Sequence, residues 1–249
     1  MSVSQTSAAP PTKHFIERPG TWRWSQCWRD VFFAHWRVAV NALRPHLPGC
    51  LEIDTFQGTA WVSTVAFWLD VWHRWLPSFG ICTNFLELNL RTYVRWQGEP
   101  GICFLSIHAD NRVAVALARL MTPLPYVQAC LSYRHLDQSR QFTCQAASDG
   151  KPKLAVDFSP KAAAFEPTCE SIEEWLLDRY RAFVPDNRGR VHRMVARHPP
   201  WSVLPVHGSI QCNRLGEPWG LDLNRQPALA HFSARMPALI RPFEMLPDV

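Results

Sequence analysis

Short runs in which apolar and polar residues alternate follow one another along most of the chain, separated by turn residues. A period of two places side chains on opposite faces of an extended strand, so the pattern predicts β-strands more often than helices. Turn signals between the runs, such as Gly58 in "TFQG", "QGEPG" at 97–101 and Asp149-Gly150 in "DGKP", predict antiparallel hairpins. The predicted strands are 50–54, 59–69, 90–96, 101–108, 126–135, 141–148 and 153–159.

Two segments have a helical pattern instead. The first begins at Asp110 or Asn111, either of which can cap it, and runs through "RVAVALARLM" to Pro123. Because it is apolar on most sides, we expect it to be largely buried. The second begins at Ser171, which has a glutamate three residues later in the capping-box spacing, and "VNALRPHL" at 40–47 predicts a shorter helix.

The chain shows no internal repeat, low-complexity tract or linker. We therefore expect a disordered tail at residues 1–14 and one domain at 15–249. The predicted fold is a mostly antiparallel, β-rich α+β domain whose sheet forms a closed or cone-shaped barrel with two or three helices packed on it.

The strand "FLELNLRTYV" at 85–94 carries polar residues at every second position. One row is Glu87, Asn89, Arg91 and Tyr93, and the opposite row is Leu86, Leu88, Leu90 and Thr92. The polar row can face solvent, as in many antiparallel sheets, or it can line a polar cavity inside a barrel. Asparagine is a poor strand former, which favours the cavity. There, Arg91 could bind a carboxylate through two hydrogen bonds and Glu87 could act as an acid or base.

Composition narrows the class of protein. With 47% hydrophobic residues, 12 tryptophans and 14 phenylalanines, the chain can form a large core. The net charge is +5, and the arginines are scattered, which does not indicate a nucleic-acid interface. The N-terminus lacks the apolar core of a secretory signal, and Asp70, His73 and Arg74 interrupt the most hydrophobic stretch. We expect a cytoplasmic protein without a membrane span.

Metal and cofactor chemistry have little support in the sequence. The eight cysteines occur singly, which predicts reduced thiols that act as small buried apolar side chains and no zinc site. His108 and Asp110 could share a strand face and bind a metal, but no third ligand has a suitable spacing, so we expect no metal. The sequence also lacks a glycine-rich nucleotide-binding motif and a serine hydrolase motif, and no cofactor is predicted.

Several motifs between about Trp28 and Val206 resemble the uncharacterised YqjF-like family (domain of unknown function 2071). They are "FFAHWRV", "LRPHLPGCLEIDTFQGTAWVSTVAF", "FLELNLRTYV", "GICFLSIHADNR", "VALARLMTPLPY" and "HPPWSVLP". The fold of this family resembles that of acetoacetate decarboxylase. The resemblance implies a soluble bacterial protein with a cone-shaped β-barrel around a polar cavity, and it implies no particular reaction.

The resemblance also bears on the catalytic lysine of acetoacetate decarboxylase, which lies in a Gly-x-Pro-Lys-Lys segment. The corresponding stretch is "PLPYVQA", which places Tyr126 and Val127 where lysines would stand. The four lysines of this chain, at 13, 151, 153 and 161, lie elsewhere. We therefore expect no Schiff-base chemistry, which needs a lysine held in a pocket. Glu87 matches the acidic strand residue of the superfamily.

Two functions remain open. The first is binding of a small polar or anionic organic molecule, one that bears a carboxylate, by Glu87, Asn89, Arg91 and Tyr126. The second is non-covalent catalysis, as a lyase or hydrolase, on a small organic acid with Glu87 as acid or base. Three histidines also stay open. His35 suits core packing or ligand contact, His108 stands where the family motif leads us to expect an acidic residue, and His198 in "HPPW" can line a cavity mouth or end a strand anchored by Trp201.

Overall fold

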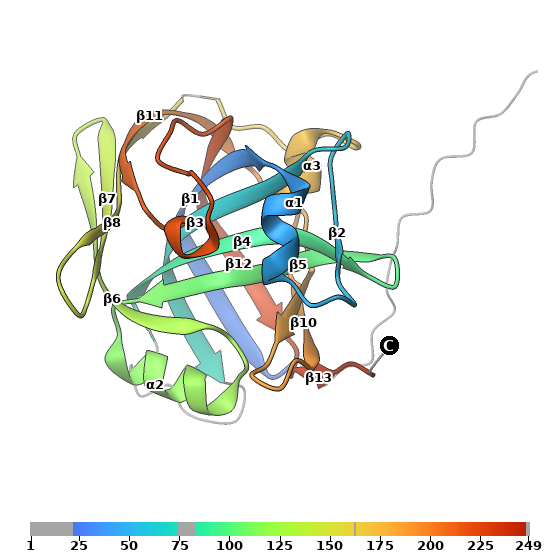
Figure 1. The fold of residues 1–249 in the computed structure, drawn as a ribbon. Coiled ribbons are helices and arrows are strands. Elements are labelled where there is room, and N and C mark those ends of the chain that lie inside the picture. Colours follow the sequence, from blue (N-terminus) through green and yellow to red (C-terminus); the bar gives the residue numbers. More distant parts are fainter. Residues whose placement is uncertain (1–21, 74–82, 162, 248–249) are drawn as a thin grey trace, which may run out of the picture.

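The computed structural model describes residues 22–73, 83–161 and 163–247, so the expected tail at 1–14 lies outside the described residues (Figure 1). Within these ranges 13 strands form one sheet. The strands are β1 (Trp24–Val38), β2 (Glu52–Ile53), β3 (Ala60–His73), β4 (Phe85–Trp96), β5 (Glu99–Ala109), β6 (Tyr126–Leu136), β7 (Ser139–Ala146), β8 (Pro152–Pro160), β9 (Arg181–Pro185), β10 (Val191–Arg197), β11 (Leu204–Asn213), β12 (Leu229–Ile240) and β13 (Glu244–Met245). The helices in the same ranges are α1 (Val40–Leu43), α2 (Arg112–Met121) and α3 (Ile172–Leu177), with 3-10 turns at Arg44–His46 and Glu217–Trp219. No helix in the described part of the chain is long and apolar enough to cross a membrane.

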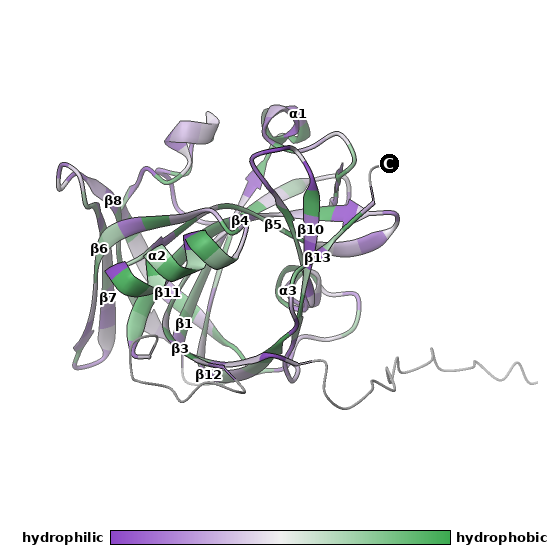
Figure 2. Ribbon diagram, turned by 90° about the horizontal axis from the view of Figure 1, so that it is seen from below, coloured by the Kyte–Doolittle hydropathy of each residue, from purple (hydrophilic) through white to green (hydrophobic). Residues whose placement is uncertain are grey.

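The sheet closes on itself. Successive pairings connect β5, β9, β10, β12, β1, β3 and β4, and β4 pairs again with β5; we call this circuit the cavity ring (Figure 2). A second ring leaves β5 through β6, β7, β8 and β11 and rejoins at β12. Among the described pairings, β5 is parallel to β6 and β9, and the others are antiparallel. The prediction of a mostly antiparallel, β-rich fold with a closed sheet is confirmed.

The two faces of β4 belong to different cores. Leu86, Leu88 and Leu90 are at most 2% exposed and pack in the core of the second ring. Phe85 and Tyr93 lie on the other face, in the core of the cavity ring. Full burial of a leucine side chain stabilises the fold by about 1.5–3 kcal/mol, so the leucine row holds β4 in register. The polar row of β4 consequently points into the cavity ring rather than to solvent.

Two of the three predicted hairpins are present. β4 turns into β5 at Gln97 and Gly98, both with positive φ (47° and 79°), as a two-residue turn of this kind requires. The β6–β7 and β7–β8 hairpins also form, the latter with Gly150 at φ 65°. At the turns with Gly98 and Gly150 the sequence signal and the structure agree, whereas the β6–β7 hairpin was not predicted.

The hairpin predicted around Gly58 is different from what we expected. Phe56 and Thr59 do bridge a tight turn in which Gly58 has φ 77°. However, β2 pairs with β4 and not with β3. Both edges of β3 are already occupied, by β1 on one side and β4 on the other, so β2 has no free edge of β3 to join.

Helix α2 begins where predicted, and its burial does not follow the prediction. The Asn111 side chain accepts hydrogen bonds from the backbone N–H groups of Val113 and Ala114, each at 3.0 Å. Only Ala114 and Val115 of the helix are buried, whereas Leu120 is 83% exposed. The expectation of a largely buried helix is therefore wrong, because α2 lies outside both rings and contacts β5 and β6 with a narrow face of small residues.

Helices α3 and α1 form as predicted. The Ser171 hydroxyl accepts from the Glu174 N–H at 3.1 Å, and the Glu174 carboxylate accepts from the Glu170 N–H at 2.6 Å. Together these bonds satisfy two backbone donors at the start of α3. Leu176 and Leu177 at its end are buried in the core of the cavity ring.

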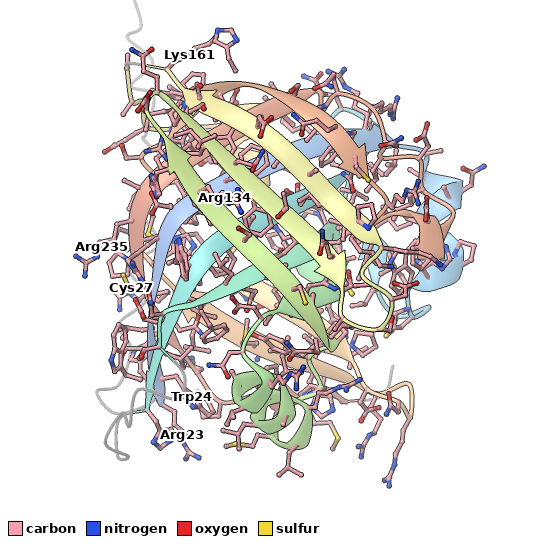
Figure 3. All side chains as sticks on the ribbon, turned by 90° about the vertical axis from the view of Figure 1, so that its left-hand side faces the viewer. Arg23, Trp24, Cys27, Arg134, Lys161 and Arg235 are labelled. Carbon is pink, nitrogen blue, oxygen red and sulfur yellow. The ribbon has the colours of Figure 1, made fainter. Side chains whose placement is uncertain are left out.

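The cysteines of the described residues are all free thiols. Cys27, Cys103 and Cys144 are buried as expected, and the Arg235 Nε donates to the Cys27 Sγ at 3.2 Å (Figure 3). Cys130 and Cys169 are exposed, so the expectation of burial fails for these two. Cys130 lies at an outward position of β6, and Cys169 precedes α3 in a loop.

Candidate functional site

A cavity of about 90 Å³ lies inside the cavity ring. All four residues of the sequence-derived site, Glu87, Asn89, Arg91 and Tyr126, line it. Much of the remaining wall is apolar or aromatic, with a few further polar side chains. These wall residues include Gln26, Trp28, Val31, Phe33, Val65, Phe67, Ile102, Phe104, Ile107, Leu177, Arg179, Arg181, Met194, His198 and Trp201.

Two local features bring the four residues together. Alternation along β4 places Glu87, Asn89 and Arg91 on its inner face. Tyr126 arrives by a different route, because α2 ends before Pro123 and the chain then returns as β6 parallel to β5, with Tyr126 beside Ile107. A hydrogen bond from the Ile107 N–H to the Pro125 carbonyl, at 3.1 Å, fixes this return.

Glu87 is held by two neighbours at the cavity wall. The Tyr126 hydroxyl donates to Glu87 Oε2 at 2.7 Å, and the Asn89 Nδ2 donates to Oε1 at 3.4 Å. Glu87 is only 5% exposed, and burial raises the pKa of its carboxyl to about 7, against the opposing effect of the two hydrogen bonds. The group therefore exchanges its proton near neutral pH.

Arg91 differs from most arginines near the cavity in its contacts. No carboxylate of the described residues lies within ion-pair distance of its guanidinium, and its Nε is buried without a hydrogen-bond acceptor. The guanidinium carbon lies 5.8 Å from the centre of the Phe33 ring. Burial lowers the pKa of Arg91, and the Tyr93 hydroxyl opposes that shift. Glu87 and Arg91 thus share one face without forming a pair.

Arg179, which also lines the cavity, differs from Arg91 because it forms an ion pair with a carboxylate. Its Nη1 donates to Asp54 Oδ2 at 2.7 Å and its Nε to the Trp175 carbonyl at 2.6 Å. Asp54 also accepts from Arg95 Nε at 2.8 Å. The Nε and Nη1 atoms of Arg179 are therefore held by the protein, whereas its Nη2 is buried without a partner among the described residues.

His35 belongs to a buried chain of hydrogen bonds behind Arg91. Its Nδ1 lies 2.6 Å from Ser63 Oγ, Ser63 Oγ lies 2.6 Å from the Tyr93 hydroxyl, and that hydroxyl donates to the Leu176 carbonyl at 3.1 Å. Since Tyr93 donates to Leu176, Ser63 donates to Tyr93, and His35 Nδ1 must carry the proton. Burial, with His231 and Arg91 nearby, holds the pKa of His35 well below its usual value. His35 is not among the cavity-lining residues, so it acts as a core residue.

His198 and Trp201 combine the two roles that the sequence left open. Both line the cavity, and both are buried. The Trp201 Nε1 donates to the Leu177 carbonyl at 3.0 Å, and its ring stacks on Trp28 with centroids 5.9 Å apart. Burial lowers the pKa of His198. "HPPW" therefore ends β10 and also builds an aromatic wall of the cavity.

His108 and Asp110 have different neighbours. His108 pairs in register with Leu88, while the Asp110 carboxylate accepts from the Leu86 N–H at 2.9 Å. Within the described ranges, no group of three or more His, Cys, Asp or Glu side chains is arranged to hold a metal.

Comparison with known proteins decides the family. The model of DUF2071, described as an uncharacterized conserved protein, matches residues 25–237. The chain belongs to the DUF2071 family. This DUF2071 chain is 34% identical over 224 residues to the uncharacterized protein YqjF of Bacillus subtilis strain 168, covering 90% of the chain and 92% of that protein.

Solved structures show the same fold at low identity. The acetoacetate decarboxylase of Legionella pneumophila matches with a TM-score of 0.66 and 14% identity over 99% of both chains. The enduracididine biosynthesis enzyme MppR, complexed with the condensation product of pyruvate and imidazole 4-carboxaldehyde, matches with a TM-score of 0.66 and 12% identity over 97% of this chain and 98% of that chain. The DUF2071 chain therefore has the acetoacetate decarboxylase-like fold.

Tyr126 and Val127, the two residues of the DUF2071 chain that stand where lysines would be needed, differ in position. Tyr126 points into the cavity and bonds with Glu87, whereas Val127 is 42% exposed. None of the three lysines in the described residues lines the cavity. Lys161, for example, is exposed just beyond the end of β8 (Figure 3).

Sequence reasoning missed much of the cavity wall. Trp28, Phe33 and Arg181 come from strands far from β4 in the chain and were not predicted as site residues. The only signal for them is strand alternation, which places Phe33 beside Val65 and Val65 beside Asn89 once the pairing is known. That pairing is not visible in the sequence.

Proposed function

We propose that the protein binds a small organic acid in the cavity, with the carboxylate on Arg91. The observation that supports this proposal is the half-buried Arg91, whose Nε is fully buried and whose guanidinium has no acidic partner among the described residues. A buried unpaired charge destabilises a fold, whereas an anionic ligand would pair with it and accept from its free Nε. Arginine is also suited to a carboxylate because its planar fork forms two parallel hydrogen bonds.

The size of the cavity limits the acid. A cavity of about 150 Å³ in another protein holds benzene, which has six non-hydrogen atoms. By that proportion, a cavity of about 90 Å³ encloses about four non-hydrogen atoms. Organic acids of two or three carbons come nearest to this size.

Paired substitutions test the role of Arg91. In Arg91→Met a half-buried charge disappears without breaking an ion pair to any described residue, so the free energy of unfolding of the ligand-free protein should stay equal or rise. The matched control is Arg179→Met, which leaves Asp54 without one of its two cations and should cost about 3–5 kcal/mol. Urea unfolding of both variants measures the difference. A loss of several kcal/mol in Arg91→Met would mean that Arg91 has a structural role, against the proposal.

Arg91→Lys tests whether Arg91 binds the carboxylate of the ligand. A thermal-shift screen of organic acids, together with mass spectrometry of small molecules that copurify with the folded protein, identifies acids that stabilise the parent. Arg91→Lys should keep the fold and lose most of that stabilisation, because an ammonium cannot form the two parallel hydrogen bonds of a guanidinium. Equal stabilisation of the parent and Arg91→Lys would refute the assignment.

The second candidate is a non-covalent lyase or hydrolase with Glu87 as acid or base. The pKa of about 7 at Glu87, inside a cavity with Tyr126 at its carboxylate, favours this candidate. However, no second carboxylate or imidazole of the described residues hydrogen-bonds with Glu87, which favours binding over catalysis. Turnover of a bound acid that disappears in Glu87→Gln, while binding of that acid persists, would establish the catalytic function.

A further inference from the structure

The Asn89 amide presents an unused acceptor at the cavity. Its Nδ2 is directed at Glu87 Oε1, and its Oδ1 is buried without a hydrogen-bond donor from the described part of the chain. Glu87 fixes this orientation while it is ionised, because a carboxylate accepts from both Asn89 and Tyr126. Asn89 is 3% exposed, so bulk water does not satisfy the oxygen. A buried acceptor without a donor is destabilising, and a ligand that donates to it gains accordingly.

Three buried polar atoms of the cavity wall have no hydrogen-bond partner among the described residues. Among the lining residues, those buried side-chain atoms without a partner are Asn89 Oδ1, Arg91 Nε and Arg179 Nη2. Two of them are donors on cations and one is an acceptor. Asn89 and Arg91 stand two residues apart on one face of β4, about 7 Å along the strand.

We propose that the ligand is a short hydroxy acid, whose carboxylate accepts from Arg91 and whose hydroxyl donates to Asn89 Oδ1. This inference rests on the proposed function and adds a second group to the ligand. A carboxylate cannot satisfy Asn89 Oδ1, because it has no proton to donate. An ammonium would add a second cation near Arg91 and would pair with the Glu87 carboxylate rather than with the neutral Asn89 Oδ1, so a donor for Asn89 Oδ1 is better supplied by a hydroxyl.

The test compares three acids of similar size by isothermal titration calorimetry: propanoate, 2-hydroxypropanoate and 3-hydroxypropanoate. At least one hydroxy acid should bind the parent about tenfold more tightly than propanoate, the factor expected for one buried hydrogen bond. In Asn89→Leu the ratio of the hydroxy-acid affinity to the propanoate affinity should fall to about one, because the acceptor for the hydroxyl is lost. In Arg91→Lys all three acids should bind more weakly.

The possible failures are distinguishable. If propanoate binds the parent as tightly as both hydroxy acids, the hydroxyl assignment is overturned and the carboxylate site stands. A preference that survives in Asn89→Leu also overturns it. If none of the three acids binds the parent, the proposed function and this inference both fail. The comparison of acids on the parent decides the question even if Asn89→Leu does not fold.

Discussion

Replacing Glu87 by glutamine should change how the free energy of unfolding depends on pH. Burial raises the pKa of Glu87 from 4.5 to about 7, so between these values the folded state binds a proton that the unfolded state has released. The contribution of this group is fully present below about pH 4.5 and is lost as the pH rises through 7. Each pKa unit corresponds to about 1.4 kcal/mol, so between pH 5 and 8 the parent should lose about 2–3 kcal/mol from Glu87.

Glutamine is close in shape to a protonated glutamate and does not titrate. The parent and Glu87→Gln should therefore have similar stability at pH 5, and the variant should be more stable at pH 8 by about 2–3 kcal/mol. Urea unfolding at several pH values between 5 and 8 measures this difference. His35, His198 and His231, with lowered pKa values, titrate in both proteins and cancel when the curves are subtracted.

Parallel curves for the two proteins would refute the reasoning. They would show that Glu87 has the same pKa in the folded and unfolded states, and hence that its carboxylate is solvated or paired in solution. A variant that becomes less stable with rising pH, relative to the parent, would indicate a cation near Glu87.

Two further predictions follow from the positions of the lysines and leucines. Incubation with labelled acetoacetate and borohydride should leave no adduct, because no lysine of the described residues lines the cavity; a labelled peptide containing Lys151, Lys153 or Lys161 would contradict this. Leu88→Ala should lower the free energy of unfolding by about 2–5 kcal/mol, since Leu88 is 0% exposed. Leu120→Ala should change the free energy of unfolding by less than about 0.5 kcal/mol, because Leu120 on the outer face of α2 is 83% exposed. Equal losses in urea unfolding would show that α2 packs against something in solution.

The local features of the fold are visible in the sequence because they depend on neighbouring residues. The turn at Gln97-Gly98 and the caps at Asn111 and Ser171 are determined within a few positions, and all three form as predicted. The pairing of β2 depends instead on which edge of the sheet remains free after β1, β3 and β4 have assembled. No local pattern carries that information.

The same distinction applies to the candidate site. Alternation within β4 suffices to group Glu87, Asn89 and Arg91, because these residues share one strand. The hydrogen bond from Tyr126 to Glu87 depends on where β6 arrives, and the exposure of α2 depends on its position outside the rings. A helix that is apolar on several sides does not itself reveal which side meets the sheet.

The burial of both faces of β4 also constrains how this strand can change during evolution. In a strand with one solvent-exposed face, a single-residue insertion turns some buried side chains toward solvent, and the fold can adapt. Here a shift of one position would bring Leu88 and Leu90 into the cavity and place Glu87, Asn89 and Arg91 in the apolar core of the second ring. Insertions and deletions in β4 are therefore tolerated only in pairs, and new binding specificities should arise by substitution at alternate positions while the length of the strand stays fixed.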